Sequence, residues 1–574
     1  MRSPAVPESF PARPVLDLVG IAENFTFEVD PAALSRELLV TAGMTLRNPA
    51  GIIAANARLL WDSLAAFRAA GERALGHDSQ GPIAIARGDK RFSDPAFQEN
   101  PAYFLLAQQY LLFSRLVDDL IDTAGVSGLR EAKARFAANF LVDALAPTNT
   151  LAGNPAAIRR AFDTGGMSLV KGLRNMVDDI RNNGGWPSQV DKSGFEVGVN
   201  MAATPGSVVY RSNLIEVIQY SPQTADTYSV PLLFCPPWIN KYYIMDLAPG
   251  KSLIEWAVQH GHSCFAISYR NPDKSMSNYG FRDYLLEGPL DAVRVVREIT
   301  GAPSVNTLSV CLGGTLTALG LAYNAARGDN SINSATLLNT HTDFTQPGSL
   351  GVFTDEATVA QLEKQMQKRG FLDSSSMART FSALRPNDLI FQYVGNNWLC
   401  GNKPPAFDLL AWNEDSTRMP AKMHSEYLCS CYLRNEFARG EFEIDGKRLD
   451  PGLIDIDTYV LAAVDDHIVP WTSGYKTTQL LGGKSRFVLS SSGHIAGIVN
   501  PPHPKAKHWV NDSLPADPRE WQANAQLVNA TWWQDWTAWI ADHGGSKVAA
   551  PDQLGSKDYP PIEEAPGGYV RATA

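Results

Sequence analysis

The stretch Ser309-Val310-Cys311-Leu312-Gly313-Gly314 decides the fold of this chain. An apolar run, 305–308, precedes it, and a helix-forming run, 315–322, follows it. Strand, sharp turn and helix in this order predict a nucleophile elbow, where the reactive side chain stands above a sheet and the next backbone N–H faces a developing oxyanion. The usual pattern is Gly-x-Ser-x-Gly. Because Cys311 takes the central position, the elbow indicates acyl transfer from a thioester rather than ordinary ester hydrolysis.

Two downstream loops supply the partners that such a nucleophile needs. Asp466 lies in the loop after a predicted strand at 458–464, and His494 in the loop after the last predicted strand at 486–490. Asp466 follows Cys311 by 155 residues, and His494 comes 28 residues later. The order nucleophile, acid, histidine is that of the α/β-hydrolase fold and differs from both main serine-protease folds.

The three side chains have distinct predicted roles. Free cysteine is mostly thiol at neutral pH, so the imidazole of His494 is expected to accept the Cys311 proton. The Asp466 carboxylate would fix the tautomer of His494 and stabilise its cation. Asp465 and His467 are neighbours that compete for the acid and base roles, and we favour Asp466 and His494. The histidines without a partner pattern are predicted to be structural or superficial: His341, His503 and His508.

An oxyanion hole requires two hydrogen-bond donors. The backbone N–H of Leu312 is the first predicted donor, because it follows the nucleophile in the elbow. The second is expected from the loop after an early strand, here 236–240. Its two prolines lack an N–H, which leaves Trp238 or Ile239, and we favour Ile239.

The 574 residues divide into two regions of different character. Residues 1–205 are predicted to form a mostly helical N-terminal domain, because apolar residues recur at three- and four-residue intervals in 101–124 and 131–145. One further helix is expected from 154 to the Gly184-Gly185 stop.

Short β-rich runs alternate with helical runs in residues 206–574, which predicts an α/β domain with a mostly parallel sheet. A helix is expected at 290–299, and an insertion of about 341–455 without clear alternation is a candidate lid or cap. The tail after Gly544 is expected to be extended. The predicted strands are 214–220, 232–235, 264–268, 307–310, 335–339, 458–464 and 486–490.

Composition excludes several classes of protein. The net charge of −10 and the lack of a dense Lys/Arg tract argue against a nucleic-acid partner. No apolar run reaches the roughly 18–20 residues of a membrane span, and residues 1–7 carry no apolar signal core, so a cytoplasmic protein is expected. Six cysteines form no disulfide framework. Cys429-x-Cys431 has no second pair nearby, so no metal site is expected.

These motifs closely resemble those of the polyhydroxyalkanoate synthases, whose lipase-like box carries a cysteine. The resemblance runs from about residue 90 to the C-terminus and is typical of the single-subunit types, classes I and II. Besides the elbow, the matching stretches are 91–97, 100–103, 236–243, 268–272, 385–389, 407–413, 465–471, 492–502 and 532–539.

The resemblance implies the reaction and its setting. A (R)-3-hydroxyacyl-CoA would acylate Cys311 and release CoA, and the polyester chain would grow while tethered through thioester chemistry. His494 would be the general base. Asp466 would act on His494 or, alternatively, activate the substrate 3-hydroxyl. The resemblance also implies a homodimer at the surface of cytoplasmic polyhydroxyalkanoate granules, with the CoA thioester as substrate and no cofactor.

Three residues depart from the family pattern. Ser309 replaces a glycine and is expected to open or repack the elbow slightly, while Trp238 and Tyr269 bear on the pocket and hence on substrate chain length.

Two alternative functions stay open on the sequence. One is a polyester depolymerase or acyl-CoA thioesterase with the same triad, and the other is a non-enzymatic granule-associated scaffold.

Overall fold

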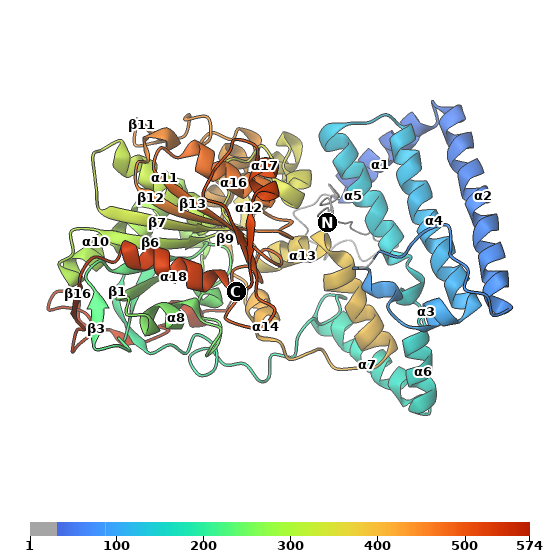
Figure 1. The fold of residues 1–574 in the computed structure, drawn as a ribbon, viewed down its shortest axis with the longest axis horizontal. Helices are drawn as coiled ribbons and strands as arrows, with labels where there is room; N and C mark the ends of the chain where they lie inside the picture. Colours follow the sequence, from blue (N-terminus) through green and yellow to red (C-terminus); the bar gives the residue numbers. More distant parts are fainter. Residues whose placement is uncertain (1–30, 87, 574) are drawn as a thin grey trace. The chain divides into compact units, whose positions relative to one another are not determined.

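The computed structural model describes residues 31–86 and 88–573 (Figure 1). Residues 1–7, on which the expectation of no signal segment rests, lie outside this part of the chain. The chain splits into two compact units. Unit 1 comprises Met1–Asp191 and Ser376–Phe407, and unit 2 comprises Lys192–Ser375 and Asp408–Ala574.

Unit 1 is helical, and it includes part of the segment expected to form a cap. Phe140 packs against Ala383 and Ile390, so the excursion Ser376–Phe407 completes the hydrophobic core of the N-terminal helices. The division at Asp191 lies before the expected boundary at residue 205. The helices of unit 1 include α1 (Pro31–Thr45), α2 (Pro49–Ala74), α3 (Ala96–Glu99), α4 (Pro101–Thr123), α5 (Gly128–Ala144), α6 (Pro155–Asp163) and α7 (Met167–Asn182).

The single helix expected from residue 154 to Gly184 is wrong, because the structure has two helices there. Gly165 and Gly166 adopt φ values of 58° and 84°, which a right-handed helix does not contain. They end α6 and begin α7, and the apolar periodicity continues on either side of the break.

A second core in unit 1 packs beside a partly buried arginine. Arg91 contacts Asp143 at 2.8 Å and Asp89 at 2.7 Å, and its guanidinium lies over the ring of Tyr110. Burial lowers the pKa of Arg91, but these carboxylates outweigh it and raise the pKa above the usual 12.5. These contacts hold the segment around Arg91, between α2 and α3, against α4 and α5.

No single helix in the described part of the chain is long and apolar enough to cross a membrane. The segment Arg36–Thr45 and helix α2 meet that criterion of length and composition only when joined, and they meet at a bend of 95°.

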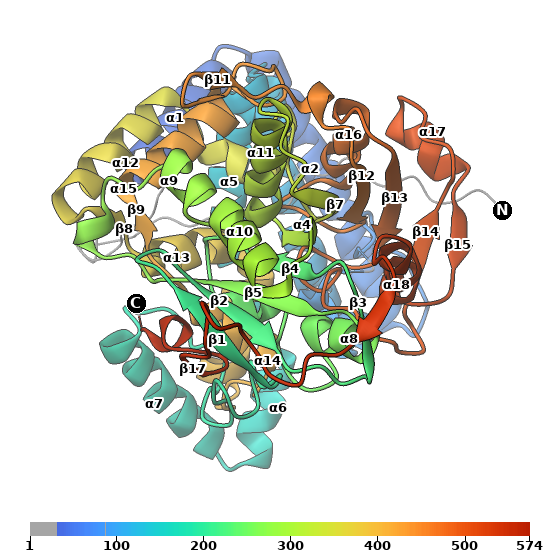
Figure 2. The same cartoon turned by 90° about the vertical axis from the view of Figure 1, so that its left-hand side faces the viewer.

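The predicted α/β architecture of unit 2 is confirmed. Among its described residues, the main sheet has eleven strands in the order β15-β14-β13-β12-β7-β6-β4-β5-β2-β1-β17, and the six central neighbours from β13 to β5 run parallel (Figure 2). The strands are β1 (Gly206–Arg211), β2 (Ile215–Tyr220), β4 (Leu232–Cys235), β5 (Cys264–Tyr269), β6 (Val305–Val310), β7 (Ile332–Leu338), β12 (Asp457–Ala463), β13 (Ser485–Ser490), β14 (His508–Val510), β15 (Gln526–Val528) and β17 (Glu563–Glu564).

Helices cover both faces of this sheet. Successive side chains of a strand point to opposite faces. On one face of β6, Ser309 contacts Thr317 of α11 (Leu312–Ala325); on the other, Asn306 donates to the carbonyl of His543, just after α18 (Trp532–Asp542). β6 is therefore buried along its whole length. The other helices of unit 2 include α8 (Leu253–Gln259), α9 (Phe281–Leu286), α10 (Pro289–Thr300), α12 (Glu356–Arg369), α14 (Asp408–Glu414), α15 (Ala421–Glu426), α16 (Trp471–Leu480) and α17 (Pro518–Ala523).

The tail after Gly544 is extended and paired. β16 (Lys547–Ala549) pairs with β3 (Asp226–Tyr228), and β17 pairs with β1 at the edge of the main sheet. Near its end, the Tyr569 N–H donates to the buried carboxylate of Glu216 at 3.0 Å. The tail therefore covers the antiparallel edge of the sheet.

Strand register brings three loops to one edge of the sheet. Val310 pairs with Leu338, Leu338 with Leu461, and Ala463 with Ser490. Because these strands are parallel, the loops after β6, β12 and β13 begin at the same level. Those loops carry Cys311, Asp466 and His494.

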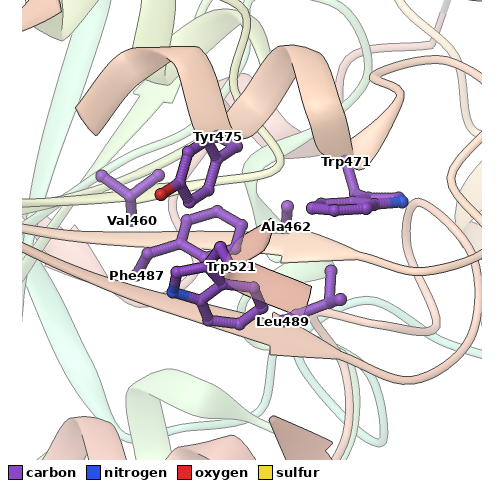
Figure 3. Packing of buried hydrophobic residues seen from close by; sticks show 7 residues of the cluster. All are labelled: Val460, Ala462, Trp471, Tyr475, Phe487, Leu489 and Trp521. Atoms are coloured by element: carbon purple, nitrogen blue, oxygen red, sulfur yellow. The ribbon is translucent and has the colours of Figure 1, made fainter. Parts of the chain in front are cut away.

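An aromatic cluster braces β12, the strand that precedes the loop of Asp466 (Figure 3). Phe487 lies edge-to-face against Trp521 with ring centroids 4.7 Å apart, and against Tyr475 at 4.8 Å. Tyr475 and Trp471 belong to α16, so the cluster joins this helix to β12 and β13. The short loop between β12 and α16 is thereby held at both ends.

Candidate active site

Cys311 occupies the turn between β6 and α11, the position predicted for it. Its backbone has φ 52° and ψ −120°, a conformation that costs a non-glycine residue on the order of 1–3 kcal/mol. The Cys311 N–H donates to the Leu338 carbonyl at 2.9 Å, which ties the turn to β7. The surrounding sheet holds the strained residue in place, and its side chain is partly exposed.

The two glycines after Leu312 are required by close packing. A Cβ on Gly313 would lie 2.4 Å from the Cys235 carbonyl oxygen, at the end of β4. A Cβ on Gly314 would lie 2.0 Å from Oγ1 of Thr340. The start of α11 therefore approaches the loops after β4 and β7 more closely than any side chain permits.

Ser309 is accommodated by a hydrogen bond. Its hydroxyl lies 2.8 Å from Oγ1 of Thr317 on α11, and its side chain is fully buried. Burial raises the pKa of the neighbouring Cys235 to about 12, although hydrogen bonds with Thr317 and Ser309 favour its ionised form. The hydroxymethyl group thus belongs to a small buried polar cluster between strand and helix.

Asp466 and His494 form a buried pair. Nδ1 of His494 lies 2.6 Å from Oδ2 of Asp466, and the side chains are 7% and 0% exposed. The other oxygen, Oδ1, accepts the N–H groups of Ile468 and Val469, each at 2.9 Å. Because a carboxylate only accepts, Nδ1 of His494 carries the proton, and Nε2 is left to accept one.

The charges around His494 favour its cation. Burial acts to lower the pKa of His494, but the Asp466 carboxylate and the Cys311 thiolate outweigh it and raise the pKa well above the usual 6.5. The Cys311 side chain thus lies close enough to His494 to influence its charge. The structure therefore places the three residues in one chain of contacts, from carboxylate to imidazole to sulfur.

The competing neighbours lie differently. Asp465 is exposed, whereas Asp466 is buried against His494. His467 is partly buried in the same loop, and the ring that contacts Asp466 and Cys311 is that of His494. Of the two neighbouring carboxylates, Asp466 is therefore the one that lies against an imidazole, that of His494.

His341 supports the loop of Asp466, a role for which the sequence offered no partner pattern. Its Nδ1 lies 3.0 Å from Oγ of Ser473, and its Nε2 lies 3.1 Å from the Ile468 carbonyl. Burial lowers the pKa of His341 to about 4, so it bridges the loop and α16 as a neutral ring.

The loop of His494 is held by side chains from distant strands and helices. Asn339, at the end of β7 with φ 45°, donates from Nδ2 to the His494 carbonyl. The indole N–H groups of Trp532 and Trp533 donate to the carbonyls of Gly497 and Ile498 at 2.8 and 2.9 Å. The tryptophan-rich α18 thus acts on the site through the loop backbone, a role that residue type alone did not reveal.

The two predicted oxyanion donors belong to the start of α11 and to the loop after β4. The Leu312 N–H is at the first position of α11, where no intrahelical acceptor exists. Ile239 lies half-buried in the loop after β4, whose first carbonyls pack against Gly313. The next N–H, that of Asn240, is already bonded to Oγ1 of Thr417 at 3.0 Å.

Tyr427 lies near Cys311 and belongs to a cluster of aromatic side chains. Tyr427 is fully buried, and burial, Tyr432 and the nearby Cys311 raise its pKa well above the usual 10. Trp238 lies edge-to-face against Tyr427 at 5.9 Å and is 2% exposed. Phe344 lies 6.4 Å from Tyr427. Such a cluster lowers the access of water to an acylated thiol.

No group of three or more His, Cys, Asp or Glu residues that could hold a metal ion exists in the described part of the chain. The proton-accepting imidazole, the adjacent thiol and the open backbone N–H suit nucleophilic acyl transfer. Fold and site together define an enzyme of the α/β-hydrolase fold with cysteine at the nucleophile's position.

Comparison with known proteins identifies the family. Residues 231–501 match the model of the alpha/beta hydrolase fold, and residues 88–257 match that of the poly-beta-hydroxybutyrate polymerase (PhaC) N-terminus. The chain is 43% identical to the poly(3-hydroxyalkanoate) polymerase subunit PhaC of Cupriavidus necator over 90% of this chain and 86% of that protein.

Two further relatives agree. Identity is 42% with poly(3-hydroxyalkanoate) polymerase 1 of Ectopseudomonas oleovorans, over 85% of this chain and 87% of the relative. It is 39% with the poly(3-hydroxyalkanoate) polymerase of Methylorubrum extorquens, over 94% and 90%. The chain therefore belongs to the poly(3-hydroxyalkanoate) polymerase family and is an enzyme of the acyltransferase type, as its motifs predicted.

Proposed function

We propose that this enzyme polymerises (R)-3-hydroxyacyl-CoA into a polyhydroxyalkanoate polyester and releases CoA, with Cys311 as the covalent nucleophile. The observation that carries the proposal is the contact of Cys311 with His494, itself paired with Asp466 at 2.6 Å, in a chain 43% identical to a named polymerase. No cofactor is needed for this chemistry, because the thioester substrate is already activated.

Acylation uses the groups in the order in which they lie. His494 Nε2 takes the thiol proton, and the Cys311 thiolate attacks the thioester carbonyl. The resulting oxyanion accepts hydrogen bonds from the N–H groups of Leu312 and Ile239. The carbon–sulfur bond to CoA then breaks, and the His494 imidazolium returns the proton to the departing CoA sulfur.

Elongation repeats the transfer with an alcohol as the nucleophile. The 3-hydroxyl of another acyl unit attacks the carbonyl of the Cys311 thioester, and its proton passes to a base. The carbon–sulfur bond breaks as the ester bond forms, and Cys311 leaves as the thiolate, which the protonated base can reprotonate. His494 is the base if Asp466 acts on it. Alternatively, Asp466 itself takes the hydroxyl proton. The aromatic cluster near Cys311 favours transfer to an alcohol over hydrolysis, because hydrolysis requires water at the same carbonyl.

One assay separates this activity from the alternatives. The protein is incubated with (R)-3-hydroxybutyryl-CoA or a longer homologue, and free CoA is measured together with insoluble polyester. CoA with polymer is expected. CoA with only free hydroxy acid would identify a thioesterase. A protein that turns over no homologue, with no difference between wild type and Cys311→Ala, would act as a scaffold.

We further propose that the enzyme works as a homodimer at the surface of cytoplasmic polyester granules. The support is its membership of the polymerase family, whose product is an insoluble polymer that stays attached to the enzyme. Sedimentation velocity with and without acyl-CoA tests the dimer. Co-sedimentation of the full chain with polyester particles tests surface attachment.

A further inference from the structure

The loop after β4, which carries the proposed oxyanion donor, is held by a single hydroxyl group from far along the chain. Oγ1 of Thr417 donates to the Trp238 carbonyl at 3.4 Å and accepts from the Asn240 N–H at 3.0 Å. Thr417 is 7% exposed. Asn240, at φ 64°, adopts a backbone conformation that few residues other than glycine and asparagine accept.

These two contacts fix the direction of the Ile239 N–H. The Trp238 carbonyl and the Ile239 N–H belong to the same peptide group, which is planar and trans, so they point in opposite directions. With the carbonyl held by Thr417, the Ile239 N–H points away from Thr417. In the described part of the chain no backbone acceptor bonds this N–H, whereas the Asn240 N–H is occupied.

A second set of contacts anchors the continuation of the loop to the same segment. Nζ of Lys241, a buried residue, lies 2.6 Å from Oδ1 of Asp415. The Tyr243 hydroxyl donates to Oδ2 of Asp415 at 2.7 Å, and the Trp412 indole donates to the Lys241 carbonyl at 2.8 Å. Burial and the Asp415 carboxylate raise the pKa of Tyr243, so it stays a donor.

The start of the loop is fixed by the elbow itself. Gly313 packs so closely on the carbonyls of Cys235 and Pro236 that no side chain fits between them. The loop is therefore held against α11 at its beginning, by Thr417 at its middle and by Asp415 at its end. The Ile239 peptide lies between these two fixed points.

We propose that the segment Asp408–Thr417 positions the Ile239 N–H for the oxyanion, with Thr417 as the positioning residue and Asp415 as its support. The inference rests on the proposed acyl transfer at Cys311. It assigns a role in that reaction to a segment that touches neither the sulfur nor the imidazole. The segment begins where the chain leaves unit 1 and returns to unit 2, between Phe407 and Asp408.

The test compares two reactions of Cys311 that differ in one respect. Acylation by (R)-3-hydroxybutyryl-CoA develops an oxyanion, whereas alkylation by iodoacetamide displaces iodide at a tetrahedral carbon and develops none. Thr417→Val keeps the shape of the side chain and removes the hydroxyl. We expect kcat for CoA release to fall about 10- to 100-fold with KM nearly unchanged, since one misdirected donor acts in the transition state.

Three controls make the result decisive. The alkylation rate of Cys311 in Thr417→Val should stay within twofold of wild type, and Thr417→Ser, which retains the hydroxyl, should restore kcat. Asp415→Asn keeps the side-chain volume and loses the charge facing Lys241. It should likewise lower kcat for CoA release and leave the alkylation rate unchanged, and it replaces Thr417→Val as the test if that variant does not fold.

Full kcat in a folded Thr417→Val protein would overturn the proposal. An equal loss of alkylation and acylation would do the same, because that pattern reports damage to the thiolate and not to the oxyanion hole. Failure of the underlying function has a different signature. In that case the wild type itself releases no CoA, or Cys311→Ala releases as much as the wild type does.

Discussion

Replacing Asp466 by asparagine tests the reading of the catalytic pair most directly. Oδ1 accepts two backbone N–H groups at 2.9 Å each, and turning the amide so that its NH₂ met these donors would sacrifice both bonds, at about 0.5–1.5 kcal/mol each. The asparagine oxygen therefore stays in place, and its NH₂ faces Nδ1 of His494. The imidazole then carries its proton on Nε2 and cannot take one from Cys311.

The magnitude follows from the bond that is lost. A buried hydrogen bond between a carboxylate and an imidazolium contributes about 1.5–3 kcal/mol, and 1.36 kcal/mol corresponds to tenfold in rate. Alkylation of Cys311 by iodoacetamide at pH 7 should therefore slow about 10- to 150-fold. The deficit should shrink at pH 9, because hydroxide can then remove the thiol proton without His494.

The measurement is the rate of label incorporation at the Cys311 peptide by mass spectrometry, alongside CoA release. Asp465→Asn is the matched control, because that neighbour is exposed, and it should behave as wild type. Alkylation of Asp466→Asn within twofold of wild type at pH 7 would refute the tautomer argument. Normal alkylation with loss of polymer growth would assign the carboxylate to the substrate hydroxyl.

Three further predictions concern the elbow and its support. Cys311→Ser should fold normally and retain only a trace of CoA release, because a serine hydroxyl is far harder to ionise; near-normal turnover would remove the nucleophile assignment. Gly314→Ala places a Cβ 2.0 Å from Oγ1 of Thr340 and should lower the unfolding free energy in urea by about 1–3 kcal/mol, whereas Gly194→Ala, with nothing within 4 Å, should not; equal midpoints would contradict the packing. The pKa of His341 is about 4 when folded and 6.5 when exposed, so the unfolded chain binds the extra proton between these values. Stability should therefore fall by up to roughly 3 kcal/mol as pH drops from 6.5 to 4, and His341→Gln should flatten the dependence of the melting temperature on pH; an unchanged slope would argue against a buried neutral ring.

Much of the α/β unit was predictable because its signals are local. Each predicted strand overlaps an observed one, and the helix expected at 290–299 is α10. The elbow depends on residues adjacent in the chain, Cys311 to Gly314, and chain order then pointed to the two downstream loops that carry Asp466 and His494. The prediction of one helix failed where Gly165 and Gly166 divide α6 from α7, because the apolar spacing continues across the break.

Long-range contacts were beyond prediction. Phe140 packs on Ile390, and this is why Ser376–Phe407 belongs to unit 1 although it lies within the expected cap. Thr417 reaches the loop after β4 from 177 residues away. A threonine has no sequence signature of such a role, because its partners here are backbone atoms that every residue offers.

The sequence by itself determined the fold class and predicted the candidate nucleophile and its order with acid and histidine, because these follow from periodicity and from motifs of a few adjacent residues. Only the tertiary structure decided between Asp466 and Asp465, since the choice depends on which carboxylate is buried against the imidazole. It also showed Ser309 bonded to Thr317, and the Trp238–Ile239 peptide oriented by Thr417. Strand register and packing create these contacts, and neither is written in any local stretch of the chain.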